Sequence, residues 1–176
     1  ILYISISKGF YMSIKLNLAC GLDYQEGYIN SDLYPSPSAK IDAQLDVSKL
    51  PYEDNSVDEI RALHIIEHFD FHEAVRVLLE WNRVLKPNGK LIIETPDFLE
   101  SCKKFVNDPL MRIDLYGQFF AQPWIPGLIH KFLFTEEQLI NHLSWSKFRD
   151  FKRIEPVSNY IRPYNKDLFL AMEAYK

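Results

Sequence analysis

Apolar side chains recur at helical spacing over residues 71–86, and the charged side chains of this stretch fall on the opposite face. This periodicity predicts an amphipathic helix. Pro87, Asn88 and Gly89 predict its end, because proline cannot continue the helical ladder and Asn-Gly favours left-handed turns. A shorter helix is predicted over residues 98–107.

Short runs of apolar and β-branched residues predict strands. They span residues 15–20, 28–33, 40–47, 57–66, 90–95, 151–157 and 168–175. Strands that alternate with helices favour an α/β fold with a mostly parallel sheet covered on both faces. Only residues 21–27 join the first two strands, whereas a parallel crossover with its helix needs at least about 10 to 12 residues. We therefore expect either a single helical turn in this link or a later start of the second strand.

The segment between the predicted second helix and Thr135 is rich in aromatic residues. Residues 110–134 are interrupted by prolines, and we expect them to be irregular. A further helix is predicted to begin after Thr135, because Gln138 stands at the capping-box position. Over residues 98–134 the aromatic side chains suit a lid over a substrate pocket. Local packing or a homodimer contact explains them equally well.

The length of 176 residues fits one domain, and we interpret residues 1–176 as such, with 1–11 an upstream or disordered extension before Met12. Hydrophobic residues at 47% and charged residues at 25% exclude a disordered chain. A net charge of −4 without a dense basic run argues against a nucleic-acid partner. No apolar stretch reaches the roughly 20 residues of a membrane helix, so we expect no membrane partner.

Cysteine usage bears on the compartment. Cys20 and Cys102 are too few for a disulfide framework, and their scarcity suits a reducing environment. The first twelve residues lack the basic leader and small-residue cleavage site of a signal peptide. We therefore expect a cytoplasmic protein.

Polar residues that could hold a nucleoside follow the predicted strands. In an open parallel sheet, ligands bind beyond the carboxyl ends of the strands. Gly21, Asp32 and Asp46 come at such positions. A carboxylate can accept both hydroxyls of a ribose, and a glycine lets the backbone approach the ligand. Each acid could instead be a cap or turn residue, and a glycine after a strand is most often only a turn.

Five segments appear together in an order and spacing that resemble class I S-adenosylmethionine-dependent methyltransferases, most closely the small bacterial predicted-methyltransferase type. They are LNLACG (16–21), INSDL (29–33), LDVSKLPYEDNSVDEI (45–60), HIIEHF (64–69) and RVLKPNGKLIIETPD (83–97). The resemblance implies a three-layer Rossmann-like sandwich. Its mostly parallel, seven-stranded sheet would have the order 3-2-1-4-5-7-6, with strand 7 antiparallel over residues 168–175.

The resemblance also implies S-adenosylmethionine as cofactor, with S-adenosylhomocysteine as product, and a set of cofactor contacts. These are Ala19, Cys20 and Gly21 at the methionine end, Asp32 at the ribose, Asp46 and Val47 at the adenine, and His64 close to the sulfonium. The chain departs from the family in three ways: its turn has the single Gly21, Asn17 replaces the usual first-strand acid, and Asp32 follows Gly21 by 11 residues, closer than the common spacing. A non-catalytic binding or scaffold protein with a degenerate site is therefore the alternative. A nicotinamide-dependent reductase would need a fuller G-x-G-x-x-G turn.

A competing motif overlaps the fourth segment. His64, Glu67 and His68 fit H-x-x-E-H, the pattern of inverted zinc metalloproteases. That chemistry needs both histidines on one face of a helix. Because a strand-like run precedes His64, we expect this residue to be extended or at the end of the strand, which spoils that geometry, and we expect no metal.

Methyl transfer needs mainly the positioning of an in-line nucleophile, and an oxygen nucleophile also needs a base. The candidates are His64, His68, Asp97 and His130, of which we favour His68 and His130 as catalytic residues. The resemblance suggests a small-molecule acceptor, such as a sugar or a polysaccharide precursor. That last step rests on analogy at the level of the fold.

Overall fold

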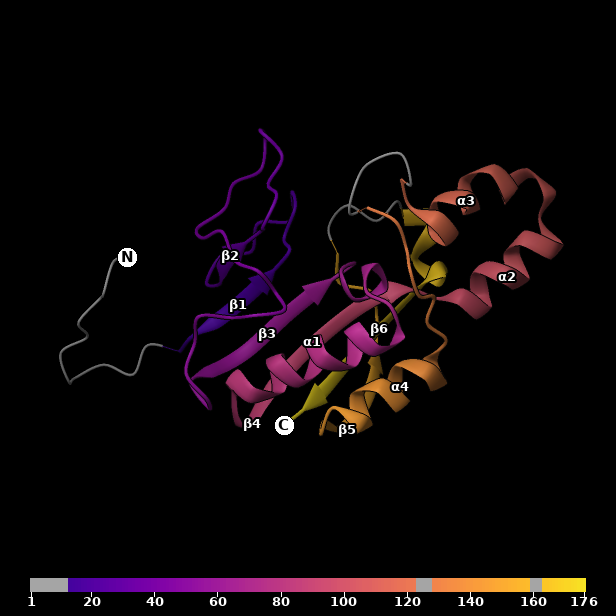
Figure 1. The fold of residues 1–176 in the computed structure, drawn as a ribbon. Coiled ribbons are helices and arrows are strands. Elements are labelled where there is room, and N and C mark those ends of the chain that lie inside the picture. The colour runs from indigo at the N-terminus through magenta and orange to yellow at the C-terminus, as the bar shows by residue number, and fades with distance from the viewer. Residues whose placement is uncertain (1–12, 123–127, 159–162) are drawn as a thin grey trace.

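The computed structural model describes residues 13–122, 128–158 and 163–176, with side chains described in the last range from residue 166 (Figure 1). The extension expected over residues 1–11 lies outside these residues. In the described part of the chain, no helix is both long enough and apolar enough to cross a membrane.

Six strands form one sheet in the order β2-β1-β3-β4-β6-β5. They are β1 (Lys15–Leu18), β2 (Ile29–Ser31), β3 (Val57–Leu63), β4 (Leu85–Pro96), β5 (Arg149–Ile154) and β6 (Phe169–Tyr175). Strands β2, β1, β3 and β4 pair in parallel, whereas β6 runs antiparallel to both β4 and β5. The predicted α/β class is confirmed, as is the antiparallel last strand.

The strand predicted over residues 40–47 is wrong, so the described sheet has six strands rather than seven. Only Ala43 makes a bridge, to Ser31 of β2. The physical reason is Asp42, whose Oδ2 accepts hydrogen bonds from the backbone N and the Nδ2 of Asn30, at 2.9 and 3.0 Å. This side chain, together with the backbone N atoms of Asp42 and Ala43, which donate to the Asn30 carbonyl at 2.7 and 3.1 Å, ties the segment to β2 without a strand ladder.

The link between β1 and β2 contains turns and no helix, and β2 starts at Ile29, one residue later than predicted. Ala19 and Gly21 both adopt positive φ angles, of 50° and 53°. Two residues in this region of backbone space reverse the chain within a few residues, which is how so short a link joins two parallel strands.

Two helices cover one face of the sheet (Figure 1). Helix α1 (Phe71–Val84) and helix α4 (Glu136–Trp145) each begin with a capping box, formed by Asp70 with Glu73 and by Thr135 with Gln138. Apolar side chains of both helices and of the facing strands make one core. Helix α1 ends before Pro87, as predicted, but β4 already begins at Leu85 and includes the Pro-Asn-Gly segment.

The opposite face of the sheet carries charged side chains. Lys15, Glu59, Lys90 and Glu173 form a row on neighbouring strands, with N–O distances of 3.5 to 3.8 Å. In the part of the chain that the structure describes, this polar row takes the place of the second helical layer that a three-layer sandwich implies.

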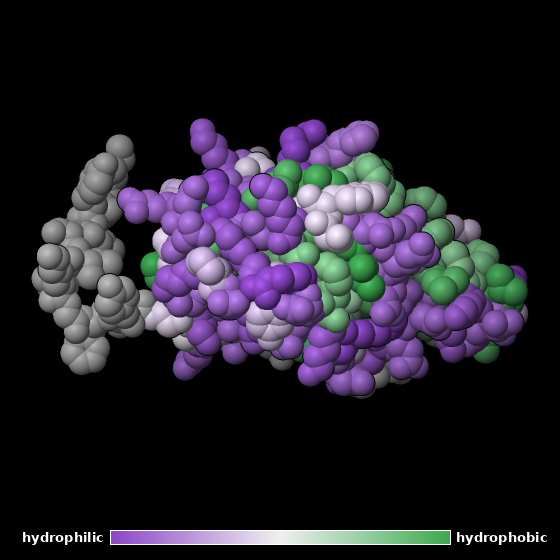
Figure 2. Space-filling view, turned by 90° about the horizontal axis from the view of Figure 1, so that it is seen from below, coloured by the Kyte–Doolittle hydropathy of each residue, from purple (hydrophilic) through white to green (hydrophobic). Residues whose placement is uncertain are grey.

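A helical pair extends beyond the carboxyl end of β4. Helix α2 (Phe98–Asn107) has the predicted bounds, and a short η2 turn (Pro109–Met111) leads to helix α3 (Arg112–Phe120). The expectation that residues 110–134 are irregular is therefore wrong over α3. Ile113, Tyr116 and Phe120 are exposed and only Leu115 is buried, so no amphipathic pattern reveals the helix. Figure 2 shows hydrophobic residues gathered at this end of the molecule.

Candidate functional site

The turn after β1 and the acid after β2 meet at one edge of the sheet. The backbone N of Gly21 donates a hydrogen bond to Asp32 Oδ2 (3.0 Å), and that of Cys20 donates to the Ser31 carbonyl (2.9 Å). A Cβ at Gly21 would meet no atom within 4 Å, so the backbone here borders open space. The turn therefore offers a ligand an approachable backbone beside a carboxylate.

Asp32 is half-buried and is held by two backbone groups. Besides Gly21, the backbone N of Tyr34 donates to its Oδ1 (2.9 Å). Each carboxylate oxygen has a second lone pair, so the fixed carboxylate can accept two further hydroxyl donors. Burial, and then the charge of Asp32, raises the pKa of the neighbouring Cys20 thiol to about 11, which keeps this thiol neutral.

A buried polar network lies beneath the turn. Arg61 Nη2 is 2.9 Å from Asp23 Oδ2, and both side chains are almost fully buried. Arg61 also donates to Asn17 Oδ1 (3.2 Å) and to the carbonyl of Val157 (3.0 Å). Asn17 in turn donates to the Asp23 carbonyl (2.7 Å). These groups anchor the turn to the sheet and line a narrow crevice beside Ala19 and Cys20.

The sequence analysis did not predict this network, although it contained a signal. Arg61 is a charged residue inside the apolar strand β3, and buried charges are rare unless they are paired. Its partner Asp23 follows the turn glycine. Asn17, which stands in β1 where the family usually has an acid, is thus part of a buried ion-pair network.

The two residues expected at the adenine differ in their surroundings. Asp46 is exposed, and its Oδ1 accepts hydrogen bonds from the backbone N and the hydroxyl of Ser48 (2.8 and 2.6 Å). This is a turn contact of the kind the sequence also allowed. Val47 is buried in the core, and its carbonyl accepts a hydrogen bond from Trp81 Nε1 (2.9 Å). The segment reaches Asp32 through Ala43, whose carbonyl accepts from the Asp32 backbone N (3.4 Å).

His64 ends β3 with a positive φ of 53° and lies between two buried carboxylates. Its Nε2 is 2.8 Å from Glu94 Oε1, and its Nδ1 is 3.5 Å from Glu67 Oε1. Burial lowers the pKa of His64, but Glu67 and Glu94 outweigh that effect and raise the pKa to about 9. Near neutral pH this ring is therefore a cation that holds both carboxylates ionised.

Glu94 has further donors and was not predicted as part of a site. The hydroxyl of Ser158 donates to its Oε1 and the backbone N of Val157 to its Oε2, both at 2.6 Å. Its signal in the sequence is an acid within the otherwise apolar end of β4. Asp97, a base candidate, instead caps α2 and pairs with Arg153 at 3.1 Å, which gives it a structural part.

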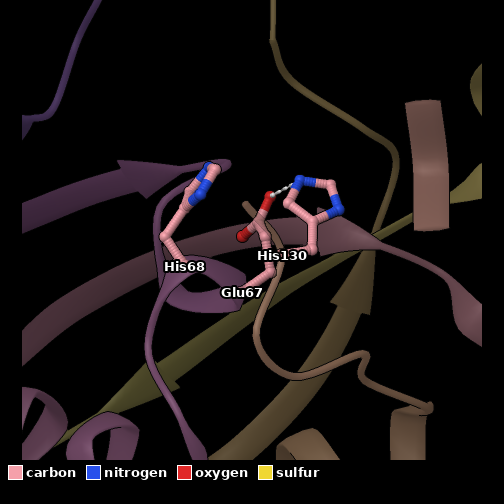
Figure 3. A group of neighbouring side chains, drawn as sticks. All are labelled: Glu67, His68 and His130. Atoms are coloured by element: carbon pink, nitrogen blue, oxygen red, sulfur yellow. Dashed lines mark ion pairs between the residues drawn. The ribbon is translucent and has the colours of Figure 1, made fainter. Parts of the chain in front are cut away.

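A second cluster brings together Glu67, His68 and His130 (Figure 3). Glu67 and His68 belong to the η1 turn (Ile66–His68) after β3, whereas His130 comes from the segment between α3 and α4. The backbone N atoms of Lys131 and Phe132 donate to the Glu67 carbonyl (2.8 and 3.2 Å) and fix this segment beside η1. The structure thus places both predicted catalytic histidines together, with ring centroids 5.0 Å apart.

The ring nitrogens of the two histidines have defined roles. His68 Nδ1 lies 3.0 Å from the Ile129 carbonyl, and His130 Nδ1 lies 2.9 Å from the Gln118 carbonyl. A carbonyl can only accept, so each Nδ1 carries a hydrogen, and the remaining ring nitrogen of each histidine is Nε2. Burial lowers the pKa of His130 below its usual range and keeps its ring neutral.

An apolar groove lies between α2 and α3. It encloses about 430 Å³ and is lined only by apolar and aromatic side chains and one thiol. Its lining residues are Phe98, Cys102, Phe105, Val106, Phe119, Phe120 and Leu133. Gln118, whose carbonyl accepts from His130, directly precedes two of these residues in the sequence.

Known proteins share this domain and this fold. Residues 10–93 match the family model described as a methyltransferase domain. No curated protein matches the chain. Among solved structures, a S-adenosylmethionine-dependent methyltransferase from Archaeoglobus fulgidus is 20% identical with a TM-score of 0.61, over 93% of this chain and 86% of its own.

Two further solved structures are similar. One of the S-adenosylmethionine-dependent methyltransferases of Methanosarcina mazei is 20% identical with a TM-score of 0.58, over 99% of this chain and 98% of its own. A chain in the complex of the Haloferax volcanii Trm112 methyltransferase activator with a putative methyltransferase is 14% identical, with a TM-score of 0.64. That match covers 93% of this chain and 82% of the other.

Proposed function

Because residues 10–93 match a methyltransferase domain and the fold is similar to that of S-adenosylmethionine-dependent methyltransferases, we propose that the chain transfers the cofactor's methyl group to a hydroxyl oxygen of a small-molecule acceptor. The observation that carries this proposal is the meeting of the Gly21 turn with Asp32, at 3.0 Å, on the sheet edge where β3 leads into the histidine cluster. One edge thus offers a nucleoside site and acceptor-facing imidazoles.

The residues fit the cofactor by their chemistry. Asp32 would accept the ribose hydroxyls through its remaining lone pairs, and the backbone of Ala19, Cys20 and Gly21 would lie along the methionine end. Asp46 and Val47 would lie beside the adenine of the cofactor. When bound, the cofactor supplies a methyl group that is already strongly electrophilic, so the protein's main task is to position the acceptor.

His64, which directly follows β3, also belongs to the proposed site. Its ring is tied between Glu67 and Glu94, so it acts by fixing these carboxylates near the reaction centre. His68 and His130 are the proposed catalytic residues, because a carbonyl binds the Nδ1 of each ring and leaves its Nε2 for the acceptor. An acceptor hydroxyl needs such a group to become a good nucleophile.

The groove between α2 and α3 bears on the acceptor. Its apolar lining favours an acceptor that carries an apolar part next to its hydroxyl, such as a lipid-linked sugar or polysaccharide precursor, over a free sugar. This makes residues 98–122 and 128–134 the acceptor wall of the site. The homodimer through the same aromatic segment and the cytoplasmic location remain predictions.

An assay of methyl transfer tests the proposal. The purified chain is incubated with S-adenosylmethionine and a panel of hydroxyl compounds with and without an apolar tail, and release of S-adenosylhomocysteine is measured. We expect release only with tailed acceptors, and a loss of about a hundredfold or more in His68→Ala and His130→Ala. His72→Ala, which changes an exposed histidine outside the cluster, is the matched control. Cofactor binding without release on any acceptor would favour the scaffold alternative.

A further inference from the structure

The cluster of Glu67, His68 and His130 has the composition of a metal site. Its carboxylate oxygen and two imidazole nitrogens lie within 4.8 Å of one another, with one residue buried and two partly exposed. Figure 3 shows the three side chains converging from η1 and from the segment that carries His130. We propose that this cluster binds one divalent first-row transition-metal ion.

The histidines are already held in the form that binds a metal. Metal-bound histidines almost always donate their second ring N–H to a carbonyl or carboxylate, which fixes the tautomer and the ring orientation. His68 does so to Ile129 and His130 to Gln118, and both Nε2 atoms remain as ligands. Two backbone acceptors on separate segments thus orient two nitrogens toward one carboxylate.

Glu67 supplies the third ligand. Its side chain is fully buried, its Oε2 accepts from the Thr95 hydroxyl (3.2 Å), and no hydrogen bond reaches its Oε1 within the described residues. Two ring nitrogens lie near Oε1, His64 Nδ1 at 3.5 Å and His130 Nε2 at 3.9 Å. Oε1 thus has an ion pair with His64 but no hydrogen bond of ordinary length, and it can serve as a ligand to a cation on the His68 and His130 side.

The ligand set selects the class of ion. Two imidazoles and one carboxylate suit Zn²⁺, Co²⁺, Fe²⁺ or Mn²⁺, whereas Mg²⁺ and Ca²⁺ prefer sites made of oxygen ligands. Zinc bonds of about 2.0 to 2.2 Å require ligand atoms closer together than in this structure, by roughly an ångström, so the side chains must close slightly on the ion. The partly exposed side chains of His68 and His130 have room to do so.

Three protein ligands leave at least one coordination position free, as in catalytic metal sites. We expect an oxygen atom of the acceptor to bind at this free position; this point alone rests on the proposed function. His68 and His130 would then act on the acceptor through the ion.

The expectation from sequence was that no metal is held. It considered His64 and His68 as the paired ligands, and the structure separates their roles. His64 is bound to Glu94, while His68 joins His130, which comes from a segment far along the chain. The proposed ligand set is therefore different from that of the H-x-x-E-H motif.

Metal binding can be measured apart from catalysis. The full chain is purified without a histidine tag, stripped with a chelator, and titrated with Zn²⁺ and Mn²⁺ by calorimetry and with Co²⁺ by visible absorption. We expect one ion per chain and a loss of affinity of more than about a hundredfold in His68→Ala and in His130→Ala, with His72→Ala unchanged. Circular dichroism confirms that each variant is folded.

Two results would overturn the site: no stoichiometric binding of any of the three ions, or unchanged binding in the His68→Ala/His130→Ala double variant. Titration of the metal-free chain with S-adenosylhomocysteine is run in parallel. If metal binds and S-adenosylhomocysteine does not, the proposed function fails and the metal site stands. The reverse outcome leaves the proposed function in place and removes the metal site.

Discussion

Loss of the Asp23 side chain should strongly destabilise the protein, because it leaves the buried Arg61 guanidinium without a counter-charge. At 2.9 Å, the pair attracts by about 6 kcal/mol at an effective dielectric constant of about 20, before desolvation is subtracted. Arg61 would keep its hydrogen bonds to Asn17 and Val157 but not its neutralising partner. Breaking such a buried pair costs about 3 to 5 kcal/mol. We expect Asp23→Ala to lower the free energy of unfolding by that amount.

The assay is urea unfolding followed by circular dichroism, with a double-mutant cycle. Arg61→Met combined with Asp23→Ala removes both charges, and replacing a buried pair by apolar groups is often close to neutral. The double variant should therefore be more stable than the sum of the single changes predicts, by at least about 1.5 kcal/mol. A cost below about 1 kcal/mol for Asp23→Ala, or additivity within about 0.5 kcal/mol, would refute the reasoning.

Three other predictions concern the cofactor edge, a buried histidine and a helix start. Asp32→Asn should weaken S-adenosylhomocysteine binding by about 1 to 3 kcal/mol in calorimetry, because it removes a charged acceptor. The control is Asp58→Asn, which changes a backbone-bonded carboxylate at the opposite edge of the sheet and should leave binding unchanged. Equal effects of the two substitutions would contradict the ribose assignment. Burial lowers the pKa of His142, so the unfolded chain takes up this proton first as the pH falls below about 6.5. The free energy of unfolding should then decrease as the pH falls through that window, by at most about 1.4 kcal/mol per pH unit. The decrease should be less steep in His142→Gln. Identical slopes for the two proteins in urea titrations at several pH values would exclude the effect. Thr135→Ala removes one half of the capping box with Gln138, so it should lower the free energy of unfolding by about 1 kcal/mol. An unchanged urea midpoint would show that the cap does not stabilise the protein.

Local signals in the sequence predicted most elements. The bounds of α2 and the start of α4 follow from periodicity and from capping, which act within a few residues. The strand predicted over residues 40–47 was wrong because Asp42 bonds to Asn30 of β2, a tertiary contact that no local pattern contains. Helix α3 was missed because it is exposed on most sides, and so lacks the apolar stripe that marks a helix.

In the candidate site too, residues marked by local signals could be predicted, and contacts between distant segments could not. Gly21 and Asp32 could be predicted because each follows a strand, and strand ends meet at one edge of a parallel sheet. His68 and His130 were predicted singly, yet their meeting at Glu67 depends on backbone hydrogen bonds between η1 and a distant segment. The pairing of Arg61 with Asp23 likewise depends on the turn geometry and not on spacing along the chain.

The central claim is that the edge formed by the Gly21 turn and Asp32 binds S-adenosylmethionine. Calorimetric titration of the purified chain with S-adenosylmethionine and S-adenosylhomocysteine, with NADH as control, tests it most directly. The account predicts saturable one-to-one binding of both sulfur compounds and no binding of NADH. A folded chain that binds neither sulfur compound would contradict it.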